Sequence, residues 1–360
     1  MNELQVALIA IGAAGVAGVW GYNKWQERRQ GRIAESVFRR GGQRDVLLGE
    51  VAGGGEVEAR PESTERHEPE FDVAADERGA MIEAPLPESL ADEIADCVVR
   101  IDFAEPVPAP GLWASQSRWA GGIGKPMSWL ALDENSGHWR QLSAHDAGRY
   151  KSVCAALQLA DRQGAVSDGD VSAFLDGVWE LARQCSGKCA IPKHDDVLMT
   201  ARSLDEFCAS VDLQLGVNIV GANEPLAGHQ LRQLAEEAGL RLLGDGAFHA
   251  QDGTGLTRFT LANIGAELFD PASLDSLATH GVTLSMDVPR VPDGPAAFDA
   301  LIALARPLTD ALGGILVDSQ GNPLTTEMIA GIRSKIAEIQ GKMAHREIVA
   351  GTQRALRLFS

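Results

Sequence analysis

Five cysteines are the residues of this 360-residue chain with the most versatile chemistry, because thiolates bind metals, attack electrophiles and form disulfides. They are Cys97, Cys154, Cys185, Cys189 and Cys208. An odd number without regular spacing is a poor disulfide framework and fits a reduced setting better. Cys185 and Cys189 are four residues apart, and the chain has no second closely spaced pair of cysteines that could complete a set of four ligands. The spacing therefore does not indicate a zinc site. We expect these thiols to be buried as small hydrophobic side chains.

A glycine-rich loop at Gly121–Lys125 is the second candidate for chemistry, because such loops can cradle phosphate. The phosphate-binding motif needs a glycine five residues before Gly124 and a serine or threonine after Lys125. These positions hold Trp119 and Pro126. The histidines are scattered singly, and the sequence contains neither HExxH nor GxSxG. The sequence therefore predicts a protein that is not an enzyme, with no catalytic residues, no metal site and no cofactor.

The charge balance limits the partners of the chain. The formal net charge is -18 at pH 7. Nucleic acid is excluded as a partner because phosphate contacts need clustered lysines and arginines. An acidic body also stays away from anionic lipid, so any contact with a membrane must come from a specific segment.

Such a segment stands at the start of the chain, where an apolar run from Leu4 to Tyr22 is broken only by Gln5. About 19 residues at 1.5 Å each cover roughly 28 Å, close to the hydrocarbon thickness of a bilayer. Trp20 and Tyr22 suit an interfacial aromatic belt. The basic residues that follow include Lys24, Arg28 and Arg29. By the positive-inside rule the N-terminus faces the periplasm and the rest of the chain is cytoplasmic.

The alternative is a cleaved signal peptide, which needs a basic region before the apolar stretch, whereas Asn2 and Glu3 stand there. We therefore predict an uncleaved single-pass anchor at residues 1–22 and a basic juxtamembrane segment at 23–40. Ala10, Ala14 and Gly18 are spaced by four residues, which would let two such helices approach closely and self-associate within the bilayer, although apolar membrane helices often contain such spacings by chance.

Residues 41–92 lose any hydrophobic pattern and are rich in glycine and acidic residues. A stretch with so few aromatic and β-branched side chains cannot bury enough apolar surface to offset its ordering entropy. We predict a disordered acidic linker. Some fifty residues of this kind give a root-mean-square span of roughly 40 Å, which sets how far from the membrane the folded part can reach.

The segment 210–343 has the pattern of a compact α+β unit. Residues 211–219 alternate apolar and polar, which predicts a strand with one buried face. A helix follows from Pro225 to a stop at Gly239. Further strands are predicted at 241–243, 247–251, 258–264, 282–288 and 315–317, and further helices at 295–312 and from Thr326 to 343. This order indicates an antiparallel sheet with helices on one face, in a split β-α-β arrangement.

The preceding segment, 95–209, repeats this order. Strands are predicted at 98–103, 127–132, 138–142, 150–159 and 189–191, and helices at 110–119, from a cap at Ser167 or Asp168, and at 195–209. We therefore predict two tandem related units, diverged copies of one fold, with residues 344–360 as a tail. Two copies of one fold should share one strand order.

The C-terminal unit resembles the C-terminal domain of the ZipA family of bacterial cell-division proteins. The residues that carry the resemblance are Phe259–Ile264, Phe269–Pro271, Gly281–Pro289 and Leu312–Asp318. The inverted N-terminal anchor and the spacer after it match as well. The resemblance implies a single-pass scaffold of the cell inner membrane that tethers the division protein FtsZ. It also implies that the FtsZ C-terminal peptide lies in a shallow apolar cleft on the open face of the sheet.

Strand alternation predicts which residues line that open face. The candidates for peptide binding are Gln214, Gly216, Gly246, Phe248, Thr260, Ala262, Ile264, Thr283 and Ser285. The alternatives are an ordinary solvated sheet face, a different cytoplasmic partner, or an enzyme or ligand-binding domain. A continuous apolar patch would favour the peptide, whereas a deep pocket with convergent titratable groups would favour a ligand. The partner of the upstream unit is left open.

Overall fold

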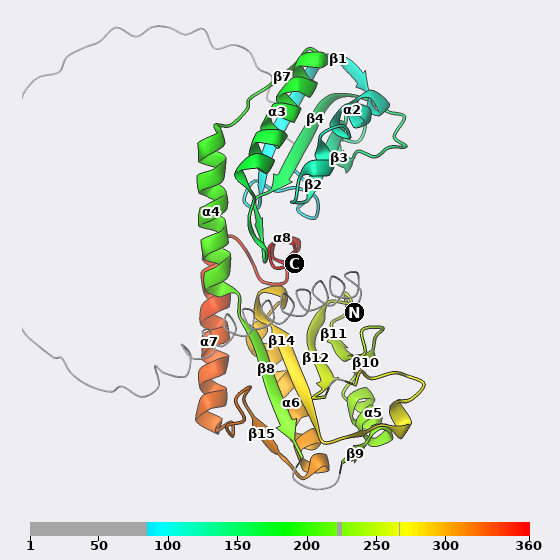
Figure 1. Ribbon diagram of the computed structural model, residues 1–360, viewed down its shortest axis with the longest axis vertical. Coiled ribbons are helices and arrows are strands. Elements are labelled where there is room, and N and C mark those ends of the chain that lie inside the picture. The colour runs from blue at the N-terminus through cyan, green and yellow to red at the C-terminus, as the bar shows by residue number, and fades with distance from the viewer. Residues whose placement is uncertain (1–84, 222–224, 266) are drawn as a thin grey trace, which may run out of the picture. The chain divides into compact units, whose positions relative to one another are not determined.

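The computed structural model of the chain describes residues 85–221, 225–265 and 267–360 (Figure 1). The predicted anchor at 4–22 and the juxtamembrane segment at 23–40 lie outside these residues. Within the described ranges, no helix combines the length and the apolar character needed to cross a bilayer. The predicted α+β class with antiparallel sheets is confirmed, since two larger sheets form, each with helices.

The first sheet has the strand order β3-β2-β4-β1-β7, and its neighbouring strands are antiparallel. Its strands are β1 (Asp96–Pro108), β2 (Met127–Asp133), β3 (His138–Gln141), β4 (Arg149–Gln158) and β7 (Gly187–Cys189). The helices of this half are α2 (Ala109–Gln116), η2 (Ala120–Gly122) and α3 (Asp168–Gln184). A small hairpin of β5 (Ala160–Asp161) and β6 (Gly164–Ala165) precedes α3.

Helix α3 covers one face of the first sheet because its apolar residues recur at helical spacing. Ser167 caps the helix as predicted, since its hydroxyl accepts a hydrogen bond from the Asp170 amide at 3.1 Å. The ring of Phe174 lies 6.4 Å from the ring of Trp119, which in turn lies 6.1 Å from Trp129 of β2. This aromatic cluster joins α3 to the sheet.

The second sheet has the strand order β10-β11-β12-β14-β8-β15, again with antiparallel neighbours. Its strands are β8 (Gln214–Val220), β10 (Arg241–Leu242), β11 (Phe248–Gln251), β12 (Thr257–Asn263), β14 (Gly281–Asp287) and β15 (Ile315–Val317). Helices α5 (Gly228–Glu237) and α6 (Gly294–Leu312) lie on one face, and α7 (Thr326–His345) packs on α6. Short elements complete this half: β9 (Leu226–Ala227), η3 (Leu274–Ser276), β13 (Ala278–Thr279) and η4 (Val288–Arg290).

Helix α4 (His194–Val211) leads from the first sheet to the second and contacts α7. The guanidinium of Arg346 stacks on the ring of Phe207 from α4, 5.3 Å from its centroid. The predicted tail at 344–360 is folded, since it carries helix α8 (Gln353–Leu358), with Leu358 and Phe359 fully buried.

The strand orders of the two sheets agree in part. In both sheets the first strand, β1 or β8, lies between β4 or β14 on one side and the short β7 or β15 on the other. The outer hairpins differ, because β2, the first strand of its hairpin, adjoins β4, whereas β12, the second strand of its hairpin, adjoins β14. The prediction of two copies with one strand order is therefore wrong. Local alternation defines strands but does not say which strand of a hairpin joins the centre of the sheet.

The folded part begins before residue 95, so the predicted linker of 41–92 extends too far. Leu86, Leu90 and Ala91 pack against buried residues of the first sheet. The linker was predicted from the glutamate-rich composition of this stretch. Its leucines nevertheless pack on an apolar face of the first sheet.

The five cysteines differ in exposure, which predicts their reactivity. Cys97, Cys154 and Cys208 are buried, and burial raises the pKa of each thiol to about 12. Cys185 and Cys189 are half-buried. In the folded protein at pH 8, a maleimide should therefore modify Cys185 and Cys189 first and leave the other three thiols intact, because the thiolate is the nucleophile. Mass mapping of the labelled peptides checks this, and early labelling of Cys97 or Cys208 would contradict it.

Candidate functional site

The outer face of the second sheet, the one turned away from α5 and α6, gathers most of the residues predicted to bind a peptide. Gly216 of β8 stands opposite Ser285 of β14, and Ser285 stands opposite Thr260 of β12. Directly opposed residues of antiparallel strands point to the same side. The same pairing unites Thr283 with Ala262, and Gln214 lies two residues before Gly216. The structure therefore brings six predicted residues together on one surface.

In the described part of the chain this surface is open except at its Gln214 end, where Arg162 of the first half binds Asp287, the residue opposite Gln214. Gln214 and Gly216 are exposed, whereas Thr260, Ala262, Thr283 and Ser285 are half-buried. The alternate residues of the same strands point toward α6 and are buried, for example Val217, Leu261 and Leu284. Figure 1 shows α6 behind β8 and β14.

One end of the outer face is apolar. Ile264 follows β12, and its amide donates a hydrogen bond to the Gly281 carbonyl at 3.1 Å. Val220 of β8 pairs with Gly281 on one side and with Ile315 of β15 on the other. The side chains of Val220, Ile264 and Ile315 are 39%, 44% and 54% exposed, which is high for residues of this size. We call these three residues the apolar end.

Gly281 leaves the space within the apolar end free of a side chain. A β-carbon at this position would lie 2.6 Å from the Ile219 carbonyl oxygen and 3.2 Å from Cγ2 of Ile264. The glycine therefore allows β8 and β14 to pair closely beneath Ile264. A visiting side chain would meet the flanks of Val220 and Ile264 there.

The opposite end of the face is polar. His249 of β11 stands opposite Thr260, so its ring lies on the outer side. Its two ring nitrogens lie 3.0 Å from Thr257 Oγ1 and 2.9 Å from Asp245 Oδ2. Burial alone would raise the pKa of Asp245, but hydrogen bonds from His249 and from the Ala247 amide hold that pKa below its usual value. The face thus runs from an apolar end to a polar end, which suits an amphipathic ligand.

Comparison with known proteins identifies this half of the chain. Residues 214–335 match the family described as "ZipA, C-terminal FtsZ-binding domain". Residues 214–335 therefore form a ZipA C-terminal domain. The matched residues, which we call the ZipA domain, contain the second sheet and both helices that back it.

Three curated relatives of the ZipA domain share the name "Cell division protein ZipA". The protein of Ectopseudomonas mendocina is 31% identical over 142 residues, which is 38% of this chain and 52% of the relative. That of Pseudomonas aeruginosa is 32% identical over 135 residues, 36% and 47% of the two chains. That of Pseudomonas savastanoi is 29% identical over 214 residues, 58% and 72%. The chain spans about half the length of the first two relatives.

Phe248 of the ZipA domain does not lie on the outer face, so this prediction is wrong. It stands opposite Leu261, which points toward the helices, and it is buried. Its ring packs against Phe269 with centroids 5.6 Å apart. The side of the sheet that a residue faces follows from its pairing with the neighbouring strand, and the sequence does not reveal that pairing.

Gly246 also belongs elsewhere, in the turn between β10 and β11. Its φ of 79° is left-handed, and a β-carbon there would lie 2.6 Å from Cβ of Leu268. Its carbonyl accepts a hydrogen bond from the Phe269 amide at 3.0 Å. Gly246 therefore positions the loop that buries Phe269 and lies in a turn, not in a strand of the outer face.

Val220 and Ile315 are the residues that sequence reasoning missed. The alternation that selects Gln214 and Gly216 in β8 continues through Asn218 to Val220, so the signal was present. Ile315 had no such signal, because a three-residue strand reveals its facing only through its pairing with β8.

The glycine-rich loop at Gly121–Lys125 shows no free cationic group for phosphate. Lys125 Nζ lies 2.5 Å from Asp161 Oδ1, and both side chains are almost buried. Throughout the described ranges, no three His, Cys, Asp or Glu side chains lie where they could share a metal ion.

Proposed function

We propose that the protein is a cell-division scaffold of the inner membrane that tethers FtsZ filaments by binding the FtsZ C-terminal peptide. The observation that carries this proposal is the open outer face of the second sheet, with its apolar end, inside a domain whose family is described as FtsZ-binding. The proposed docking residues are Gln214, Gly216, Val220, Thr260, Ala262, Ile264, Thr283, Ser285 and Ile315.

Peptide binding on such a face draws its free energy from apolar contact at one end. Burying apolar surface is worth about 25 cal/mol per Å², so covering the three side chains of the apolar end supplies most of the attraction. Small residues such as Gly216, Ala262 and Ser285 let a peptide backbone approach the middle of the sheet closely. Polar groups of the peptide would meet the polar end.

The membrane part of the proposal rests on the sequence. An anchor at residues 1–22, followed by Lys24, Arg28 and Arg29, would hold the chain in the bilayer with the ZipA domain in the cytoplasm. The acidic linker would then let the domain search the space near the membrane without adhering to anionic lipid.

Substituting Ile264 with aspartate tests the docking face. Ile264→Asp places a charge where the peptide must exclude water, so affinity for a labelled FtsZ C-terminal peptide should fall about tenfold or more. The domain should stay folded because Ile264 is exposed. Fluorescence titration of the full chain measures both affinities.

The matched control is Met199→Asp on α4, which adds the same charge at another exposed apolar residue. The control should bind the peptide as the unaltered chain does. Equal affinity of all three proteins, or no binding by the unaltered chain, would remove the outer face from the proposal.

A further inference from the structure

The first sheet also has a face turned away from its helix, but that face is covered. Leu130 of β2 stands opposite Cys154 of β4, and both are fully buried on the side away from α3. Leu86, Leu90 and Ala91, from the segment before β1, pack against them. This covered face corresponds in the fold to the open face of the second sheet, because α3 and α6 take the same place relative to the three shared strands.

The covering segment, Pro85–Ala95, consists of two short turns, the second one capped by Asp92, whose carboxylate accepts hydrogen bonds from the Ile94 and Ala95 amides. The carbonyl of Pro87 accepts hydrogen bonds from the amides of Leu90 and Ala91, at 2.8 and 3.0 Å, which makes one helical turn. Leu86 and Leu90 are four residues apart and therefore point to one side of such a turn. A single turn is not stable in water, so the order of this segment comes from the sheet beneath it.

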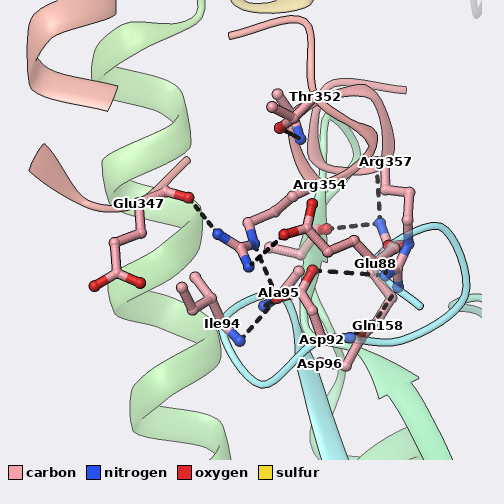
Figure 2. A network of polar contacts seen from close by, with 12 residues as sticks. Glu88, Asp92, Ile94, Ala95, Asp96, Gln158, Glu347, Thr352, Arg354 and Arg357 are labelled. Atoms are coloured by element: carbon pink, nitrogen blue, oxygen red, sulfur yellow. Dashed lines mark hydrogen bonds and ion pairs between the residues drawn. The ribbon is translucent and has the colours of Figure 1, made fainter. Parts of the chain in front are cut away.

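Two arginines of the C-terminal helix α8 hold the segment in place (Figure 2). Arg354 Nε donates to Asp92 Oδ1 at 3.0 Å. Arg357 donates to the Asp96 carboxylate and, at 3.3 Å, to the Glu88 carbonyl. The side chains of Asp92 and Asp96 are only 6% and 1% exposed, so these ion pairs are shielded from water.

Helix α8 is itself fixed to the ZipA-domain half. The Gly351 amide donates to the Pro289 carbonyl of η4 at 3.1 Å. Gly351 has a φ of 77°, and a β-carbon there would lie 2.5 Å from Cδ of Pro292. Gln158 of β4 donates to the Arg357 carbonyl at 3.1 Å, which joins α8 to the first sheet. Helix α8, which carries the two arginines, is therefore held by contacts with both halves of the chain.

We propose that the covered face of the first sheet is a peptide-docking surface whose ligand is the chain's own segment Pro85–Ala95, held by Arg354 and Arg357. The ligand chemistry is an acidic peptide with two leucines four residues apart, which matches an apolar face beside two guanidinium groups. The partner of the upstream half is thus intramolecular. This inference does not depend on FtsZ binding by the second sheet.

Cys154 offers a direct readout because it lies beneath the segment. Cys97 serves as an internal control. It stands opposite Leu157, whereas its neighbour Val98 stands opposite Ala156 on the covered face, so Cys97 points to the α3 side of the sheet. In the variant Leu86→Asp/Leu90→Asp the segment can no longer dock. Maleimide labelling of Cys154 should then quicken about tenfold or more while Cys97 stays protected. A synthetic peptide of residues 85–95, added in trans, should restore the protection, and the same peptide with both aspartates should not.

The outcomes separate a docked ligand from an integral part of the core. Continued protection of Cys154, exposure of both thiols in a protein that keeps its near-ultraviolet circular dichroism, or no rescue by the peptide would overturn the proposal. If the variant loses that signal and unfolds, Arg354→Ala/Arg357→Ala decides instead. Selective labelling of Cys154 in that variant supports the proposal, and labelling unchanged from the wild type, or equal labelling of Cys154 and Cys97, overturns it.

Discussion

Replacing Gly228 with alanine should lower the melting temperature by roughly 8–16 °C, because the substitution is expected to cost about 4 kcal/mol or more. Gly228 opens helix α5, and its amide donates to the Leu277 carbonyl at 2.7 Å. A β-carbon there would overlap the carbonyl oxygen of Leu274 in η3. Since the obstacle is backbone, no side-chain rotation can relieve it, and the loop that includes η3 must move off the helix. Thermal unfolding followed by circular dichroism measures the effect.

Gly331→Ala is the matched control, because Gly331 lies inside helix α7 and a β-carbon there would meet no neighbouring atom within 4 Å. Alanine is a better helix former than glycine, so this variant should gain about 0.5–1 kcal/mol. The same chemical change should thus have opposite signs at the two sites. A melting temperature for Gly228→Ala within about 2 °C of the wild type, a shift worth about 1 kcal/mol or less, would contradict the close packing at η3.

Replacing Arg162 with alanine should destabilise the protein by about 2–3 kcal/mol, the second-largest effect that we expect. The Arg162 guanidinium, in the β5–β6 turn, binds both oxygens of Asp212 and both oxygens of Asp287, with the shortest contacts at 2.7 Å. These two carboxylates follow α4 and end β14, so one cation joins the first half to the second. Without it, two partly buried negative charges face each other. Urea unfolding measures the loss.

Exposure is the reason why Arg162 should matter more than other arginines. Its side chain is 21% exposed, and those of Asp212 and Asp287 are 26% and 27% exposed. Arg333 binds both oxygens of Asp299 at 2.9 Å, but these two side chains are 50% and 53% exposed. Arg333→Ala should therefore cost less than about 1 kcal/mol. In the Arg162→Ala background, Asp287→Asn should be stabilising because it removes one of the two unpaired negative charges. Equal losses of unfolding free energy in Arg162→Ala and Arg333→Ala would disprove the bridging role.

Sequence reasoning could predict the faces of long strands but not of short ones. The alternation in β8, β12 and β14 correctly grouped Gln214, Thr260 and Ser285, because period-two patterning directly reflects which side is buried. It failed at Phe248, since the four residues of β11 carry too little pattern and their facing depends on pairing with Leu261. The sequence signal for a face grows with strand length.

Helix boundaries and distant contacts were harder to predict than the elements themselves. Pro225 suggested the start of α5, yet the helix begins at Gly228 because Leu226 and Ala227 pair with β13 first. The folding of the tail also escaped prediction. Arg354 and Arg357 bind carboxylates more than 250 residues earlier in the chain, and no local pattern encodes such a pairing.

That pairing has a consequence for the order of synthesis. Domains generally fold as they leave the ribosome, N-terminal parts first. The first sheet can assemble early, but Arg354 and Arg357 are made 262 and 261 residues after their partners Asp92 and Asp96. Asp92 and Asp96 therefore remain without these cationic partners until helix α8 has been made. A chain that stops before helix α8 would therefore lack the contacts of Arg354 and Arg357 with the segment Pro85–Ala95 and with Asp96.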